Sequence, residues 1–288
     1  MPKYLIIGNS AGGIGAVEAI REVDSQGSLV VVSSEPYPAY SRPAITEFLM
    51  GERAFDERMH FRDEGFYERN DVEAHLGLQV ARLDLTNRHA VLENGYKLAW
   101  EKLLLATGGT PIIPRMEGLD MQGVHTFVTI EDARKLDEAL RRGAKRVVVI
   151  GGGLIGCSLT HGLLRRGGVE ITLVELRERI LTTMMDARAS QMVEERLREL
   201  GVRLITGRSV VRILPSGGGK VGGVALDNGD QIPCDVVGVA VGVTPRLELA
   251  HGTAIKTNRG ILVDKHMETT VPGVYACGDV AEAYDFIY

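Results

Sequence analysis

The sequence predicts an α/β fold in which one kind of unit, a parallel sheet with helices and a β-meander, occurs twice. Two glycine-rich turns, at 8–13 and 151–156, each follow a short apolar run and precede a helical pattern. Two Asn-Gly turns, at 94–95 and 228–229, add the strongest short-range signal for a hairpin. The glycine turns lie 143 residues apart and the Asn-Gly turns 134 apart, so we expect a duplicated fold.

The first copy opens on a β-like run at 4–7 that leads through the glycines into an amphipathic helix. Ile14, Val17 and Ile20 recur every three residues, with charged residues on the other face. A β-branched run at 29–32 follows and leads to Glu35. Three further strands are predicted near 79–84, 90–92 and 103–105.

The second copy repeats this order. A buried strand is predicted at 146–150, a helix after the turn, and a strand at 171–174 that leads to Glu175. Its three further strands are predicted at 210–214, 224–226 and 236–242. The Ser-Gly-Gly-Gly stretch at 216–219 is then a meander loop rather than a linker between domains.

Composition excludes several classes of protein. The chain has 288 residues, 35 of them Gly, with a formal net charge of −5, so it has no basic footprint for nucleic acid. No apolar run predicts a membrane span, and the N-terminus does not read as a signal peptide. Cys157, Cys234 and Cys277 are too far apart in sequence for a disulfide scaffold or a Cys-x-x-Cys metal site. We expect no metal and a cytoplasmic location.

The glycine turns have the chemistry of dinucleotide sites. A G-x-G-x-x-G turn lets backbone N–H groups and a helix N-terminus meet a pyrophosphate, and an acidic residue on the next strand binds ribose hydroxyls. The second turn fits fully, whereas Ser10 replaces the middle glycine of the first. Glu175 would repel a 2′-phosphate, which favours NADH over NADPH, although Arg177 and Arg179 nearby could partly offset this or simply form a solvated face.

These residues resemble a known family, the pyridine nucleotide-disulfide oxidoreductases, over essentially the whole chain. The likeness rests on the two glycine turns together with Ala-Thr-Gly-Gly at 106–109 and Thr-Val-Pro-Gly-Val-Tyr-Ala-Cys-Gly-Asp at 270–279. It is greatest to the NADH oxidase, nitrite reductase and rubredoxin or ferredoxin reductase branch. The resemblance implies two Rossmann-like three-layer domains, with residues 111–240 as an NAD-binding domain inserted into an FAD-binding domain made of 1–110 and 241–288.

The resemblance also implies site residues. Those that would bind FAD are Gly8, Ser10, Ala11, Gly12, Gly13, Glu35, Arg42, Pro43, Val80, Ala106, Thr107, Gly108 and Asp279. Those that would bind NADH are Gly151, Gly153, Leu154, Ile155, Gly156, Glu175 and Gly242. Arg42 would lie near the isoalloxazine ring, where a cation stabilises the reduced flavin; the alternative is a surface ion pair.

Three departures from the family pattern narrow the mechanism. Residues 36–49 contain no cysteine, so thiolate chemistry at the flavin is not expected. The Lys and Glu that many relatives pair near the flavin are Glu47 and Ser158 here, and no catalytic residue is assigned. The chain also ends a few residues past Asp279, in an apolar Phe-Ile-Tyr at 286–288, which suggests truncation before a C-terminal interface domain and a homodimer only in a longer form.

The expected function is hydride transfer between NAD(H) and FAD, with electrons passed to an external acceptor. An iron–sulfur protein or partner subunit is the first choice of acceptor, because a flavin can divide a hydride into single electrons. Two alternatives stay open: an NADH oxidase or quinone reductase, and a redox sensor that binds FAD and NADH with little turnover.

Overall fold

The computed structural model describes residues 2–283, which form two compact units. Among these residues, the first unit contains 2–41, 56–110 and 244–283, and the second contains 42–55 and 111–243. Each unit has one five-stranded parallel sheet and one three-stranded antiparallel meander. The predicted α/β fold is therefore confirmed, while the apolar end at 286–288 lies outside the described residues.

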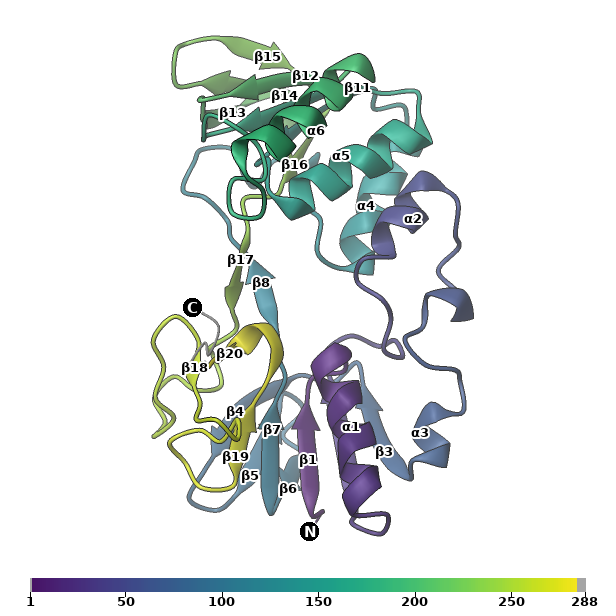
Figure 1. Ribbon diagram of the computed structural model, residues 1–288, viewed down its shortest axis with the longest axis vertical. Coiled ribbons are helices and arrows are strands. Elements are labelled where there is room, and N and C mark those ends of the chain that lie inside the picture. Colours follow the sequence, from purple (N-terminus) through teal and green to yellow (C-terminus); the bar gives the residue numbers. More distant parts are fainter. Residues whose placement is uncertain (1, 284–288) are drawn as a thin grey trace. The chain divides into compact units, whose positions relative to one another are not determined.

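The sheet of the first unit has the strand order β19-β7-β1-β2-β3, and α1 lies against it (Figure 1). Its strands are β1 (Tyr4–Ile7), β2 (Leu29–Ser33), β3 (Val72–Leu76), β7 (Lys102–Leu105) and β19 (Val274–Ala276). The meander strands are β4 (Val80–Asp84), β5 (His89–Leu92) and β6 (Lys97–Ala99). The remaining elements are α1 (Ala11–Val23), η1 (Glu57–Met59), α3 (Phe66–Arg69), β18 (Ile261–Leu262), η2 (Gly278–Val280) and β20 (Ala281–Glu282).

Alternation along β1 divides the core of this unit between the two faces of the sheet. Leu5 and Ile7 belong to a cluster that includes meander residues and the buried Trp100. Ile6 belongs to the opposite cluster, with Ile14 and Val17 of α1. Successive strand side chains point to opposite faces, so a continuous apolar run is what a sheet covered on both sides requires.

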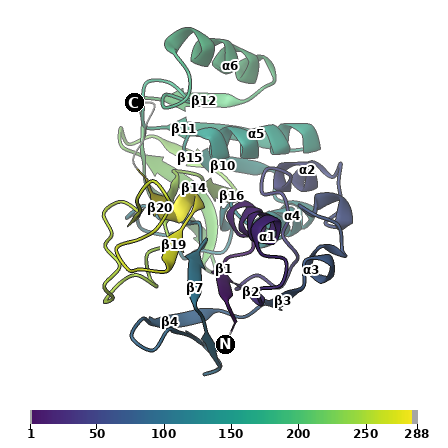
Figure 2. The same ribbon diagram turned by 60° about the horizontal axis from the view of Figure 1, so that its bottom comes forward.

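The second unit repeats this plan with the strand order β12-β11-β10-β16-β9. Figure 2 shows α5 running along β10 and β11, which it contacts. The sheet strands are β9 (Val124–Thr126), β10 (Arg146–Ile150), β11 (Glu170–Glu175), β12 (Arg203–Thr206) and β16 (Val236–Val239). The helices are α2 (Ile45–Met50), α4 (Ile130–Arg141), α5 (Leu154–Arg166) and α6 (Ala187–Glu199). The meander is β13 (Val210–Gly217), β14 (Lys220–Leu226) and β15 (Gln231–Pro233), and β8 (Gly109–Pro111) pairs with β17 (Val243–Pro245) where the chain passes between units.

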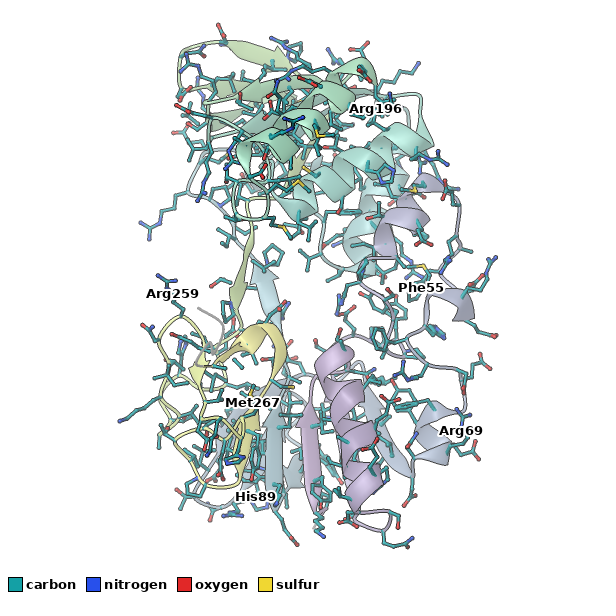
Figure 3. The ribbon with its side chains drawn as sticks, viewed as in Figure 1. Phe55, Arg69, His89, Arg196, Arg259 and Met267 are labelled. Carbon is teal, nitrogen blue, oxygen red and sulfur yellow. The ribbon has the colours of Figure 1, made fainter. Side chains whose placement is uncertain are left out.

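The segment 42–55 groups with the second unit, whereas the division drawn from the sequence placed it in the first. Its helix α2 packs on α5 so closely that a Cβ on Gly162 would lie 3.2 Å from Leu49. The ring of Phe55, labelled in Figure 3, has the Arg134 guanidinium of α4 4.8 Å from its centroid. The contact of Leu49 with Gly162 and that of Phe55 with Arg134 hold this segment against α5 and α4.

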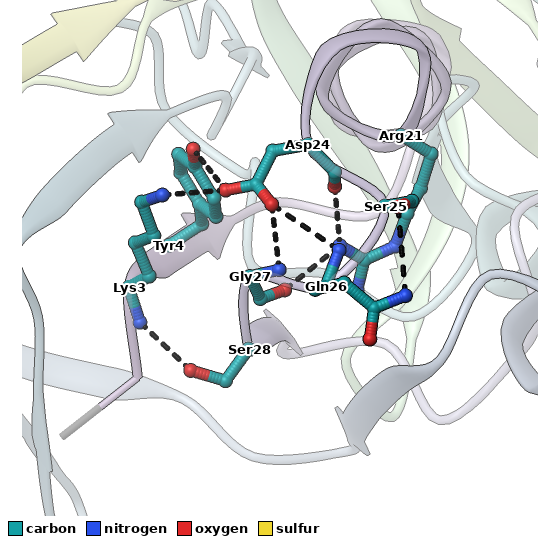
Figure 4. Close-up of polar contacts among 8 residues, drawn as sticks. All are labelled: Lys3, Tyr4, Arg21, Asp24, Ser25, Gln26, Gly27 and Ser28. Carbon is teal, nitrogen blue, oxygen red and sulfur yellow. Dashed lines mark hydrogen bonds and ion pairs between the residues drawn. The ribbon is translucent and has the colours of Figure 1, made fainter.

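A polar network forms around the N-terminal end of β1 and the turn between α1 and β2 (Figure 4). Asp24 accepts hydrogen bonds from the Lys3 ammonium at 2.6 Å and from the Tyr4 hydroxyl at 2.9 Å. These bonds hold the pKa of Asp24 well below its usual range. Arg21 donates to the carbonyls of Asp24 and Gly27, so the turn is fixed from both sides.

No helix in the described part of the chain is long and apolar enough to cross a membrane.

Candidate nucleotide-binding sites

The first glycine turn is pressed against the end of β7. Gly8 has a φ of +122°, and a Cβ there would lie 2.0 Å from the carbonyl oxygen of Ala106. A Cβ on Gly13 would lie 2.0 Å from the carbonyl oxygen of Gly8. Both distances are far below van der Waals contact, so this turn can form only with glycine at these positions.

The second turn repeats these contacts. Gly151 has a φ of +105°, and a Cβ there would lie 2.5 Å from the carbonyl oxygen of Ala240, at the end of β16. A Cβ on Gly156 would lie 1.8 Å from the carbonyl oxygen of Gly151. Gly242 follows β16 with a φ of +126°, as Gly108 follows β7 with a φ of +68°. The duplication extends to single backbone contacts.

The middle position of the second turn differs from the others because it faces open space. A Cβ on Gly153 would meet nothing within 4 Å, and its φ of −78° suits any residue. Ser10 occupies the same place in the first turn with a φ of −128°. Glycine is therefore not required there by the chain itself, which accounts for the serine. Space that a Cβ would fill, directly before a helix N-terminus, fits a bound pyrophosphate.

The helix N-termini at these two turns lack a side-chain cap. Neither Ser10, before α1, nor Gly153, before α5, makes a side-chain capping hydrogen bond. By contrast, Thr129 and Asp132 form a capping box on α4, and Asp186 accepts from the N–H of Ala189 on α6. Because the first N–H groups of a helix have no intrahelical partner, the turns before α1 and α5 present free donors and a positive dipole end to an anion.

The acidic residue beside each turn is held by hydrogen bonds. Glu35 accepts from the Tyr40 hydroxyl at 2.6 Å. In the second unit, Glu175 accepts from the N–H of Gly152 at 2.5 Å through Oε2 and from the N–H of Arg177 at 2.8 Å through Oε1. Each carboxylate oxygen of Glu175 has two lone pairs and accepts one of these bonds, so it can also accept a hydrogen bond from a ribose hydroxyl.

The remaining first-unit candidates gather at the carboxyl ends of β1, β7 and β19. A Cβ on Gly12 would lie 2.9 Å from the Cys277 sulfur and 3.7 Å from Ala106 Cβ, so three segments far apart in sequence converge there. Asp279 is exposed in η2, directly after β19. Gly108 and Gly278 both have open space where a Cβ would stand, which leaves room for a ligand.

Other residues predicted to bind a nucleotide are buried in the core, bonded within the protein, or located in the other unit. Thr107 donates to the carbonyl of Arg246, and the side chain of Val80 is buried in the core of the first unit. Arg42 and Pro43 belong to the second unit, where the Arg42 guanidinium lies 3.5 Å from the carbonyl oxygen of Val128. Leu154, the first residue of α5, is exposed, as Ala11, the first residue of α1, is in the first turn. Ile155, which follows Leu154, is half-buried.

The two residues that replace the family's Lys and Glu lie on the packed helices α2 and α5. Glu47 of α2 forms an ion pair with Arg53, with its Oε2 2.9 Å from the guanidinium Nε. Ser158 lies on α5, four residues before the Gly162 contact with α2. A carboxylate paired with an arginine cannot take the place of a lysine ammonium.

The three cysteines are not activated thiols. Burial raises the pKa of Cys157 to about 11 and that of Cys234 to about 12, and it also raises the pKa of Cys277. Neighbouring Glu175 and Asp235 add to the rise at Cys157 and Cys234. All three are free thiols in the structure. Across residues 2–283, no group of three or more His, Cys, Asp or Glu side chains is arranged to hold a metal ion.

Sequence reasoning missed the residue between the first two motif glycines. In the second turn this is Gly152, whose N–H binds Glu175 and where a Cβ would lie 2.6 Å from Ile180 Cγ2. In the first turn it is Asn9, whose amide donates to the carbonyl of Tyr37 and accepts from the Tyr67 hydroxyl. The run of three glycines at 151–153 was the available signal, since the motif itself needs only two of them.

Comparison with known proteins gives a consistent result. The family described as pyridine nucleotide-disulphide oxidoreductase matches residues 2–288. The chain is similar to the NADH-dependent phenylglyoxylate dehydrogenase subunit epsilon of Aromatoleum evansii, at 34% identity over 99% of this chain and 66% of that protein. It is also similar to the biphenyl dioxygenase system ferredoxin–NAD(+) reductase component of Paraburkholderia xenovorans, at 34% identity over 96% of this chain and 66% of that protein.

Among solved structures, the chain is similar to the ferredoxin reductase for the CYP199A2 system from Rhodopseudomonas palustris. The TM-score is 0.93 at 27% identity, over 99% of this chain and 70% of that chain. The chain thus spans just under two thirds of the length of the two curated relatives above.

Proposed function

The chain belongs to the pyridine nucleotide-disulphide oxidoreductase family, and we propose that it is an FAD flavoprotein that exchanges a hydride with NAD(H) and passes the electrons to an external acceptor. One observation carries the proposal. Two uncapped helix N-termini each follow a glycine turn that is pressed on a strand carbonyl, with a carboxylate beside it. Such a pair fits two dinucleotides, one in each unit.

We assign FAD to the first unit and NADH to the second. In the first unit, the N–H groups at 11–13 would bind the FAD pyrophosphate, Glu35 the adenosine ribose and Asp279 the ribityl region. In the second unit, the N–H groups at 154–156 would bind the NADH pyrophosphate and Glu175 its ribose. The carboxylate of Glu175 disfavours a 2′-phosphate, so NADH is preferred over NADPH.

The chain's own residues bind and orient, and they supply no thiol. FAD bound in the first unit would supply a two-electron acceptor that can release its electrons singly. Hydride transfer needs the two reacting rings to be positioned rather than a protein acid or base, which is compatible with Glu47 and Ser158 at the sites of the missing pair. The three cysteines, one buried and two half-buried, all have a raised thiol pKa and form no disulfide, so no route through a protein disulfide is proposed.

The proposed acceptor is an iron–sulfur protein or a partner subunit. The relatives named above as ferredoxin reductases support an iron–sulfur acceptor, and the one named as a dehydrogenase subunit supports a partner chain. The oligomeric state and the cytoplasmic location stay predictions.

Anaerobic titration of the FAD-loaded chain with NADH tests the proposal. NADH should bleach the flavin absorbance near 450 nm rapidly and with one equivalent, whereas NADPH should act about tenfold or more slowly at equal concentration. A chain that binds no flavin, or a flavin that NADH does not bleach, would disprove the proposal. Added ferredoxin, dioxygen and a quinone should then be compared as acceptors, and ferredoxin should reoxidise the flavin fastest.

A second candidate, a redox sensor with little turnover, is favoured by one observation. The Glu47–Arg53 ion pair and Ser158 stand where an oppositely charged Lys and Glu occur in many relatives. The same titration separates the two functions. A sensor would bind both nucleotides but show slow bleaching, over minutes, and no acceleration by any acceptor.

A further inference from the structure

The loop 176–186 comes directly after β11 and contains two arginines. Side chains of α6 hold it by hydrogen bonds. This loop adjoins Glu175, and any role for it in binding rests on the proposed function, in which the second unit takes NADH. Ile180, at the centre of the loop, is fully buried. Its N–H donates to Glu194 Oε1 at 3.2 Å, and its carbonyl accepts from the Ser190 hydroxyl at 2.9 Å. Both backbone groups of one loop residue are thus held by buried α6 side chains.

The same loop is docked on the second glycine turn. The N–H of Leu181 donates to the carbonyl of Gly152 at 2.8 Å, and the side chain of Ile180 fills the place where Gly152 has no Cβ. Leu181 has a φ of +54°, a left-handed conformation that a leucine adopts only when its surroundings impose it. The loop conformation is therefore determined by the contacts of Ile180 and not by local preference.

Arg179 is bound by the same Ser190 hydroxyl and by a backbone carbonyl just before α6. Its Nη1 donates to the Ser190 hydroxyl oxygen at 2.7 Å and to the carbonyl of Met185 at 2.8 Å. Arg177 is the more accessible arginine: its side chain is exposed, and its Nη1 donates to the Thr182 hydroxyl at 2.9 Å within the loop. Ser190 thus connects Ile180 and Arg179 through one oxygen atom.

We propose that Ser190 and Glu194 are positioning residues for nucleotide selectivity, because they lock the loop in a form that keeps Arg179 bound to α6 and away from a 2′-phosphate. An arginine near the ribose is the usual means of binding that phosphate, and its planar fork pairs with phosphate oxygens when it is free to do so. Selectivity for NADH then has two parts. The charge of Glu175 repels the 2′-phosphate, and the contacts with α6 keep the Arg179 guanidinium from pairing with that phosphate.

The test measures dissociation constants of NAD⁺ and NADP⁺ for the full chain by calorimetry. The variants are Ser190→Ala, Arg179→Gln and the double variant, with Gln191→Ala as a matched control on the exposed face of α6. Gln191 is exposed, as is Arg196 of the same helix, which is labelled in Figure 3. Melting temperatures verify that each variant is folded.

Ser190→Ala should improve NADP⁺ binding relative to NAD⁺ by about fivefold, since it releases one of the two contacts of Arg179. Arg179→Gln alone should leave the ratio of the two dissociation constants unchanged, and in the double variant it should abolish the gain of Ser190→Ala. Gln191→Ala should leave the ratio as in the wild type.

Three results would overturn the proposal. In the first, Ser190→Ala folds and keeps the wild-type ratio. In the second, its gain persists in the double variant. In the third, Arg179→Gln alone weakens NADP⁺ more than NAD⁺, and this outcome decides the question even if Ser190→Ala does not fold. A wild-type chain that binds neither nucleotide would instead overturn the proposed function, together with this inference.

Discussion

At the scale of single residues, glycines of one motif have two different tasks. The fold requires glycine at Gly8 and Gly151. Both have a positive φ, and a Cβ at either position would collide with a backbone carbonyl at the end of a strand. Gly153 is different, since its φ is negative and its surroundings are open. Gly8 and Gly151, at the first position of each motif, determine whether the turn forms, and Gly153, at the middle position, determines what the turn can approach.

Alanine substitution should separate these tasks. We expect Gly153→Ala to change the free energy of unfolding by less than about 1 kcal/mol, because no atom obstructs the new methyl group. NADH affinity should fall about tenfold or more, because the methyl group occupies the space proposed for the pyrophosphate. Urea unfolding and calorimetric titration measure the two effects.

Gly151→Ala is the matched comparison within the same turn. Its methyl group would collide with the carbonyl of Ala240 at a strained φ, so we expect a loss of about 3 kcal/mol in unfolding free energy. Equal stability losses for Gly153→Ala and Gly151→Ala would contradict this distinction.

Asp235 provides a pH-dependent test. Its carboxylate pairs with Arg146 at 2.6 Å and accepts from the N–H groups of Lys145 and Arg146, and the side-chain bond from Arg146 is the largest cause that lowers its pKa to about 2. Because the folded pKa lies below the unfolded value of 3.8, the stabilisation is fully present above the unfolded pKa and is lost as pH falls through about 2.

We expect Asp235→Asn to remove about 1 kcal/mol of stability at pH 6, a value that allows for solvent screening of this partly exposed pair. The difference from wild type should shrink as the pH is lowered from about 4 to about 2. Urea unfolding at a series of pH values measures it. A difference that stays constant down to pH 2 would show that the carboxylate charge is not what stabilises this contact.

At the scale of elements, an ion-pair cluster joins α2, α4 and α5. Asp137 of α4 is 9% exposed and pairs with Arg166 of α5 at 2.5 Å and with Arg141 at 2.8 Å. Arg166 also donates to the carbonyl of Leu49 near the C-terminus of α2. One guanidinium thus connects three helices, and it explains how a segment as short as α2 is held in the second unit.

Removal of the central carboxylate should loosen this arrangement. We expect Asp137→Asn to lower the free energy of unfolding of the second unit by about 2 kcal/mol, because Arg166 loses its charge partner in a largely buried position. Amide hydrogen exchange should rise first in α2, which depends on Arg166. Glu138→Gln is the control. Glu138 directly follows Asp137 in α4, and its exposed carboxylate pairs with Arg142, so its removal should have little effect. Equal effects of both substitutions would refute the role of Asp137.

At the scale of the whole molecule, the two units share one backbone plan but differ in what supports it. The residue between the first two motif positions is Asn9 in one turn, bonded to Tyr67, and Gly152 in the other, filled by Ile180. Each unit has a cysteine near its glycine turn, Cys277 in the first and Cys157 in the second, and both are half-buried thiols whose pKa is raised. Within residues 2–283, neither unit carries an exposed nucleophilic thiolate.

Alkylation should therefore leave the proposed electron transfer intact. At pH 8 only about one in a thousand Cys157 thiols, and fewer Cys234 thiols, would be ionised. Iodoacetamide should therefore react slowly with the native chain. NADH-driven reduction of an external acceptor should persist after treatment, and mass spectrometry verifies that the thiols are unmodified. Rapid loss of activity together with modification of any one cysteine would contradict a thiol-free mechanism.

Local sequence predicted the elements that depend on local preference. The glycine turns, the Asn-Gly hairpins and the alternation of strands all rest on φ preferences and side-chain periodicity, which short windows of sequence contain. The segment 42–55 was not predicted to join the second unit, because its place depends on Gly162, Asp137 and Arg166, which are distant in sequence. The loop at 176–186 was missed for the same reason, since Ser190 and Glu194 have no motif that links them to Ile180.

Residue type and spacing alone are sufficient to predict the duplicated α/β plan, the two glycine turns and the absence of a cysteine beside the first βαβ unit. They do not reveal which glycines the backbone requires and which leave room for a ligand, or which arginine beside Glu175 is bound to a helix. Those properties arise where segments distant in sequence meet. The carbonyl of Ala240 and the hydroxyl of Ser190 acquire their roles only when folding brings Gly151 and Arg179 against them.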